Sequence, residues 1–156
     1  MDDQEVMAKA LAFEKSFNHR FNDLDLLTGA LVSSGYPNEH KLFVPKYRHA
    51  VLANLGDTVI DVLATEHLIR EKLMSDAGQI TVLRNRMVNG NSLNELAGPI
   101  LQFLVMTGGE RNEVECSCIP GESVEALVGA MYLDGGLPAA RRLLEMLGFF
   151  DKEYEE

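Results

Sequence analysis

The fold is decided by the stretch GESVEALVGAMYLDGG, which occupies residues 121–136. Its larger apolar residues recur at the spacing of one helix face, and they are Val124, Leu127, Val128 and Met131. Glu122 and Glu125 are three residues apart on the opposite face, beside Ala126 and Gly129. The stretch therefore predicts a helix with one buried side and one side that carries two carboxylates among small residues.

Two interpretations of this carboxylate pair remain open on the residues alone. Acidic side chains in the first turn of a helix are stabilised by the positive end of the helix dipole, so Glu122 and Glu125 can be explained without any ligand. Carboxylate oxygens are also the ligands that a hard cation such as Mg²⁺ prefers, and the neighbouring small residues leave room for a metal and a substrate.

A second stretch, AVLANLGDTVID at residues 50–61, has the same two-sided character. Asp57 and Asp61 are one helical turn apart on its polar side, where the alternatives are a solvated face or carboxylates shared by a cation. The apolar side is predicted to hold Leu52, Leu55, Val59, Val62 and Leu63. Gly56 costs about 1 kcal/mol relative to Ala in a helix interior, which another closely packed helix would explain.

The remaining segments also have helical periodicity, and no stretch alternates as a strand would. We predict one all-α domain of about seven helices over residues 1–156, with an acidic tail at 151–156. Residues 35–39 are interpreted as a turn and 107–121 as loop. Expected helix-capping residues are Asn22 or Asp23 and Ser75 or Asp76, and separate helices are expected near 122–133 and 138–147.

Composition indicates an ordinary globular protein, with 156 residues of which 46% are hydrophobic. Two cysteines are too few for a disulfide framework, and the N-terminus is acidic where a signal peptide would be basic, so we expect a cytoplasmic protein with free thiols. The net charge of −10 is unfavourable for a protein that binds nucleic acid through basic residues alone. Either nucleic acid is not the partner, or cations assist.

Together the two stretches resemble the ribonuclease III family. The family's signature helix, Glu-x-x-Glu-Phe-Leu-Gly-Asp-x-Val-Leu, is matched by residues 50–60, and its second motif, Asp-x-x-Glu-Ala-Leu-Ile-Gly-Ala-x-Tyr-Leu-Asp-Gly-Gly, by residues 122–136. Residues 21–36 look like the family's opening helix, and 83–97 look like its middle helices. The resemblance extends over about residues 17–148.

This resemblance implies an all-α homodimer that cleaves double-stranded RNA with Mg²⁺, for which Mn²⁺ could substitute. It assigns the catalytic and metal-binding roles to Asp57, Glu122 and Glu125. Many members carry a C-terminal double-stranded-RNA-binding domain. We expect a nuclease domain without one, as in the mini ribonuclease III branch.

Three residues depart from the family pattern. Ala50 and Ala53 replace carboxylates, and Asn54 replaces the Phe that packs across the dimer. The mini branch has a similar stretch at these positions. The alternative function is therefore a ribonuclease III-like domain that has lost catalysis and binds RNA or a protein partner, and a third alternative is a helical dimer with no RNA role.

RNA contacts require basic side chains, and two stretches free of acidic residues supply them. The expected RNA-binding residues are Lys41, Lys46, Arg48, Arg84 and Arg86. Each of them could equally belong to a solvated surface.

Overall fold

The computed structural model describes residues 2–39 and 44–153, and it confirms the predicted all-α class. Within those ranges the one β pairing is an isolated bridge between Val32 and Val105. The α-helices are α1 (Asp2–Phe17), α2 (Leu24–Leu31), α3 (Tyr36–Glu39), α4 (His49–Arg70), α5 (Ala77–Val88), α6 (Gly90–Leu96), α7 (Gly108–Asn112) and α8 (Ile119–Met146), and the 3-10 helices are η1 (Gly98–Phe103) and η2 (Val114–Cys116).

Local chemistry sets several of these boundaries as the sequence predicts. The Asp23 carboxylate caps α2 by accepting from the Asp25 N–H at 3.0 Å, and Asp76 caps α5 by accepting from the Gln79 N–H at 2.8 Å. Gly136 has φ +74°, a left-handed conformation that favours glycine, and it divides α8 into two helical segments. The two helices expected around residues 122–133 and 138–147 are these segments.

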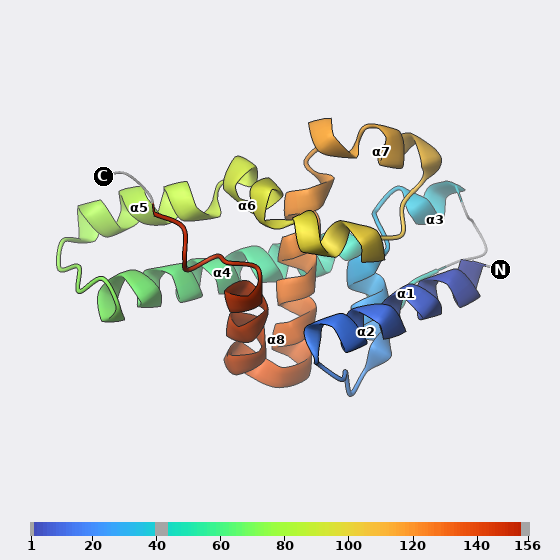
Figure 1. The fold of residues 1–156 in the computed structure, drawn as a ribbon, viewed down its shortest axis with the longest axis horizontal. Coiled ribbons are helices and arrows are strands. Elements are labelled where there is room, and N and C mark those ends of the chain that lie inside the picture. Colours follow the sequence, from blue (N-terminus) through green and yellow to red (C-terminus); the bar gives the residue numbers. More distant parts are fainter. Residues whose placement is uncertain (1, 40–43, 154–156) are drawn as a thin grey trace.

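The long helices α4 and α8 cross at the centre of the molecule (Figure 1). Helices α1 and α2 lie at one end of α4, and α5 lies alongside its other end. The main core is formed where α2, α6 and η1 pack around the crossing of α4 and α8. This arrangement brings the two carboxylate-bearing stretches of the sequence into direct contact.

Some sequence predictions were wrong in detail. Residues 36–39 form the short helix α3 rather than a turn, and 107–121 contains α7, η2 and the start of α8 rather than loop. The start of α7 has a capping box, in which Thr107 and Glu110 each bond the backbone of the other, and this stabilises a helix too short for periodicity to reveal. Val62, expected in the core, is 48% exposed because α4 has helices packed on part of its circumference only.

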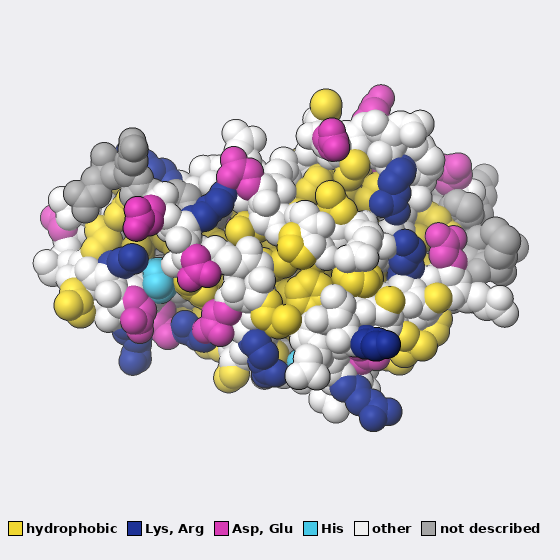
Figure 2. All heavy atoms as spheres, in the orientation of Figure 1, with side chains coloured by type: hydrophobic (Ala, Val, Ile, Leu, Met, Phe, Trp, Pro, Cys, Tyr) yellow, Lys and Arg dark blue, Asp and Glu magenta, His cyan; other side chains and the backbone are white. Residues whose placement is uncertain are grey.

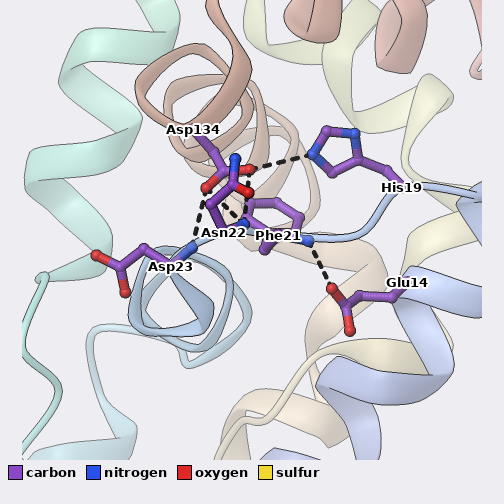
Figure 3. A network of polar contacts seen from close by, with 6 residues as sticks. All are labelled: Glu14, His19, Phe21, Asn22, Asp23 and Asp134. Carbon is purple, nitrogen blue, oxygen red and sulfur yellow. Dashed lines mark hydrogen bonds and ion pairs between the residues drawn. The ribbon is translucent and has the colours of Figure 1, made fainter.

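The loop between α1 and α2 is fixed to α8 by the carboxylate of Asp134, whose side chain is 2% exposed (Figure 3). It accepts from the Asn22 N–H and the Asp23 N–H, each at 3.0 Å, and His19 Nε2 lies 3.4 Å from it. The Glu14 carboxylate accepts from the Phe21 N–H at 2.6 Å in the same loop. These bonds give the buried carboxylate its partners and hold the start of α2 against α8.

No helix among the described residues is both long enough and apolar enough to cross a lipid bilayer.

Candidate functional site

The site is built on the point where α4 and α8 touch backbone to backbone. A Cβ atom added to Gly56 would lie 1.7 Å from the Glu125 carbonyl oxygen, and one added to Gly129 would lie 2.1 Å from the Leu52 carbonyl oxygen. No larger side chain fits at either position without separating the helices. The close packing inferred from the mid-helix Gly56 is thus observed.

This crossing brings the Asp57 carboxylate on α4 beside the Glu125 carboxyl group on α8. Burial, the charge of Asp57 and a hydrogen bond with Asp57 together raise the pKa of Glu125 to about 7. The negative charges of Glu122 and Asp61 make smaller contributions in the same direction. Two carboxylates that cannot both ionise freely make a site that gains from a bound cation.

Glu122 lies on the same helix as Glu125 but is exposed, and its contact is with a cysteine. The Cys118 thiol donates to Glu122 Oε1 at 3.3 Å, and this bond raises the pKa of the thiol. Among residues 2–39 and 44–153, no three or more His, Cys, Asp and Glu side chains are arranged as a ready metal cage. The described carboxylates therefore offer a close pair, Asp57 and Glu125, with Glu122 nearby but turned to Cys118.

Asp61 extends this acidic surface by one turn of α4. Burial raises the pKa of Asp61, the charge of Asp57 raises it further, and Arg84 on α5 lowers it. The Arg84 Nη1 group donates to Thr65 Oγ1 at 3.2 Å. Sequence patterns did not single out Thr65, because its contact with Arg84 joins residues 19 positions apart on different helices.

The predicted RNA-binding residues are not gathered in one place. Lys41 lies outside the described residues. Lys46, Arg48 and Arg86 are exposed, and the Lys46 ammonium lies 5.3 Å from the centre of the Tyr47 ring. Figure 2 shows Lys and Arg side chains interspersed with Asp and Glu on the face in view.

The positions that depart from the family pattern lie beside the carboxylate pair on α4. Ala53 is partly buried and packs against the core, whereas Ala50 and Asn54 are exposed. The Ala53 methyl group thus lies one turn before Asp57, at a position where the resemblance implies a carboxylate. No second acidic side chain of α4 precedes Asp57, and Asp61 follows it.

Comparisons with known proteins report what the sequence and the fold of this chain are similar to. A family model described as ribonuclease-III-like matches residues 23–148. Curated relatives named ribonuclease 3 include that of Nitratidesulfovibrio vulgaris, which is 31% identical over 82% of this chain and 51% of its own length. The ribonuclease 3 of Desulfotalea psychrophila is 34% identical over 95% of this chain and 63% of its own length. The chain thus spans about half to two thirds of the length of these curated relatives.

Solved structures of the nuclease domain of ribonuclease III from Campylobacter jejuni share this fold. One superposes with a TM-score of 0.71 and 27% identity, covering 95% of this chain and 97% of that one. A second has a TM-score of 0.70 and 29% identity over 86% and 92% of the two chains, and it is described as flexible in a region involved in dimer formation. The likeness therefore covers nearly the whole of a nuclease domain.

Proposed function

The chain belongs to the ribonuclease III-like family, and we propose that it is a Mg²⁺-dependent endoribonuclease that cleaves double-stranded RNA at the Asp57–Glu125 pair. The observation that carries this proposal is the paired carboxyl groups, held by a backbone contact between two helices. Glu125 is half-buried beside the charge of Asp57, which raises the pKa of Glu125, and a bound cation would relieve the repulsion between the two groups.

The residues present fit a magnesium ion by the chemistry of their donor set. Mg²⁺ is commonly bound by one or two carboxylates and completes its shell with water and phosphate oxygens, so Asp57 and Glu125 suffice as direct protein ligands. Glu122 is proposed as an additional ligand, direct or through water, once it leaves Cys118. Mn²⁺ is an expected substitute because it accepts the same oxygen ligands.

A bound magnesium ion would supply an activated water and neutralise charge on the departing oxygen. The chain's own part is to present Asp57 and Glu125 in a fixed relation and to release the proton held by Glu125. Because the pKa of Glu125 is about 7, that proton is released around neutral pH. The Glu125 carboxylate beside Asp57 is then the state that binds a cation.

A homodimer is the assembly we propose, through the outward side of α4. Val51, Val62 and Ile69 are 63%, 48% and 49% exposed. Their spacings of 11 and 7 residues place them on one stripe of the helix. Exposed apolar stripes of this kind mark protein interfaces. Val62→Asp should lower the sedimenting mass, whereas Leu11→Asp, at an equally exposed apolar residue of α1, should leave it unchanged.

The second candidate function is a domain that binds RNA or a protein without cutting, and Ala53 is the observation that favours it.

The nuclease proposal is tested by incubating the pure protein with a long RNA duplex in Mg²⁺ and then in EDTA. Cleavage of the duplex is expected in Mg²⁺ and not in EDTA. Asp57→Asn and Glu125→Gln should abolish it with the fold intact, while Glu145→Gln, at an exposed carboxylate far along α8, should not. Binding without cleavage in the wild type would establish the second candidate instead.

A further inference from the structure

The first turn of α8, which carries Glu122, is not capped by the residue at its own N-cap position. That residue is Cys118, and its thiol bonds the Glu122 carboxylate instead of a backbone group. The first N–H groups of a helix have no acceptor inside it and need one from elsewhere. The Ser117 hydroxyl accepts from the Ile119 N–H at 3.3 Å. A proline follows, so the next N–H group in need of an acceptor belongs to Gly121.

Asn94 of α6 supplies that acceptor and bonds the chain on both sides of the helix start. Its Oδ1 accepts from the Gly121 N–H at 2.7 Å, and its Nδ2 donates to the Ser117 carbonyl oxygen at 3.2 Å. Glycine is needed at position 121 for this approach, since an added Cβ would lie 2.8 Å from Asn94 Oδ1 and 3.3 Å from the Gly90 carbonyl oxygen. One amide therefore ties the turn before α8 to its first residues, and the turn cannot rotate without breaking a bond.

This arrangement leaves the Glu122 carboxylate out of helix capping. The N–H groups of the turn have other acceptors, and the N–H of Glu122 itself donates to the Cys118 carbonyl oxygen at 3.1 Å. The Glu122 side chain is exposed, and it lies near enough to Glu125 for its charge to raise the pKa of that group. The carboxylate is thus available to a cation, and the direction of its helical turn is set by Asn94.

We propose that Asn94 is a positioning residue for the reaction, whose two backbone bonds hold the first turn of α8 so that Glu122 is available to a cation bound at Asp57 and Glu125. The inference rests on the proposed nuclease function and adds to it a residue that acts through Glu122. Hydrogen bonds that orient metal ligands change the metal affinity when they are removed, although they do not touch the metal.

The test measures cation binding to full-length protein without RNA. Mn²⁺ is titrated and its free-ion paramagnetic resonance signal is followed, and duplex cleavage over a range of Mg²⁺ concentrations is the second readout. Asn94→Ala removes both bonds, and Asn94→Leu removes them while retaining a side chain between α6 and α8. Asn89→Ala is the matched control, because Asn89 also bonds two backbone groups, the Ser92 N–H at 2.9 Å and the Arg86 carbonyl oxygen at 3.1 Å, and both lie outside α8.

Both Asn94 variants should bind Mn²⁺ about fivefold more weakly and need about fivefold more Mg²⁺ for half-maximal cleavage. Their kcat at saturating Mg²⁺ should stay within about twofold of wild type, because excess cation compensates for a weakened ligand. Asn89→Ala should lower the melting temperature in EDTA, as the Asn94 variants do, but leave the Mn²⁺ affinity unchanged.

A double-mutant cycle with Glu122 separates positioning from a general loss of stability. Glu122→Gln alone should weaken Mn²⁺ binding at least as much as Asn94→Ala. Adding Asn94→Ala to Glu122→Gln should then cause no further loss, because the ligand through which Asn94 acts is already gone.

Three results would overturn the inference while leaving the nuclease intact. They are wild-type Mn²⁺ affinity in both Asn94 variants, an equal loss of affinity in Asn89→Ala, and full additivity of Asn94→Ala with Glu122→Gln. A wild-type protein that neither binds Mn²⁺ nor cuts the duplex would overturn the proposed function itself.

Discussion

Two of the helices that contact α4 differ in how tightly they pack, the first segment of α8 and the helix α5. The α8 segment is buried almost throughout its first three turns, and its backbone touches α4 at Gly56 and Gly129. Helix α5 buries only Met87 fully among its twelve residues. The proposed cation ligands therefore lie where the structure is held most tightly, whereas Arg84, one of the expected RNA-binding residues, projects from a lightly packed helix.

The largest expected loss of stability comes from forcing α4 and α8 apart at their backbone contact. Gly129→Ala places a methyl group 2.1 Å from the Leu52 carbonyl oxygen and should lower the free energy of unfolding by about 3 kcal/mol or more, because backbone cannot move aside cheaply. Urea denaturation measures this. Gly90→Ala is the control, since nothing lies within 4 Å of its added methyl group. Equal stability in the two variants would contradict the backbone contact.

The next effect concerns the far end of the same α8 segment. Asp134→Ala removes the buried acceptor for the Asn22 and Asp23 N–H groups and should cost about 2 kcal/mol in unfolding free energy, because both hydrogen bonds are lost. Asp134→Asn keeps one carbonyl oxygen in place and should cost less. Thermal melting of both variants checks the order, and the reverse order would assign the effect to charge rather than to hydrogen bonding.

Replacing Glu125 is expected to raise the stability of the protein, by less than the two preceding substitutions lower it. The pKa of Glu125 rises from an ordinary 4.5 to about 7 in the folded protein, so the folded state holds a proton that the unfolded chain releases between those values. Wild-type stability therefore falls as pH rises through this window. Glu125→Gln should be more stable than wild type above pH 7, by on the order of 1 kcal/mol because the group is half exposed, and the gain should vanish below pH 4.5.

That comparison is made by melting in EDTA at acid and alkaline pH, with Glu145→Gln as a carboxylate control. Adding Mg²⁺ should then favour wild type over Glu125→Gln at alkaline pH. A pH-independent difference between the two proteins would show that folding does not raise the pKa of Glu125.

The smallest effect is expected on α5. Val82 is 51% exposed, so Val82→Ala should change the free energy of unfolding by no more than about 0.5 kcal/mol. Amide hydrogen exchange should also be faster along α5 than along the first segment of α8. Equal exchange rates along α5 and the first segment of α8 would contradict the difference in packing between the two helices.

Much of the fold could be predicted from the sequence, because the patterns that indicate it join residues close together in the chain. The apolar spacing of residues 121–136 identifies the buried face of α8, and Gly56 indicates a close helix contact before its partner is known. Asp23 and Asp76 act as caps because capping joins residues two or three apart. The resemblance to the ribonuclease III family, confirmed by the comparisons, supplied the pairing of Asp57 with Glu125.

What could not be predicted depends on contacts between distant residues. The Thr65–Arg84 bond needs the packing of two helices, and the turn of Glu122 toward Cys118 depends on a side-chain rotamer. Helix α7 was missed because its capping box, not an apolar face, stabilises it. Val62 was placed in the core because periodicity does not report which side of α4 lacks a neighbour.

The contact between Gly56 and Gly129 also bears on how this chain can diverge. Because main-chain atoms set the distance between the two helices, the surrounding side chains can be exchanged without altering the spacing of the positions that carry Asp57 and Glu125. A carboxylate can be lost at position 53 while its neighbours keep their separation. Gly56 and Gly129 thus fix the distance between α4 and α8, so the residues around them can change without moving the two helices apart.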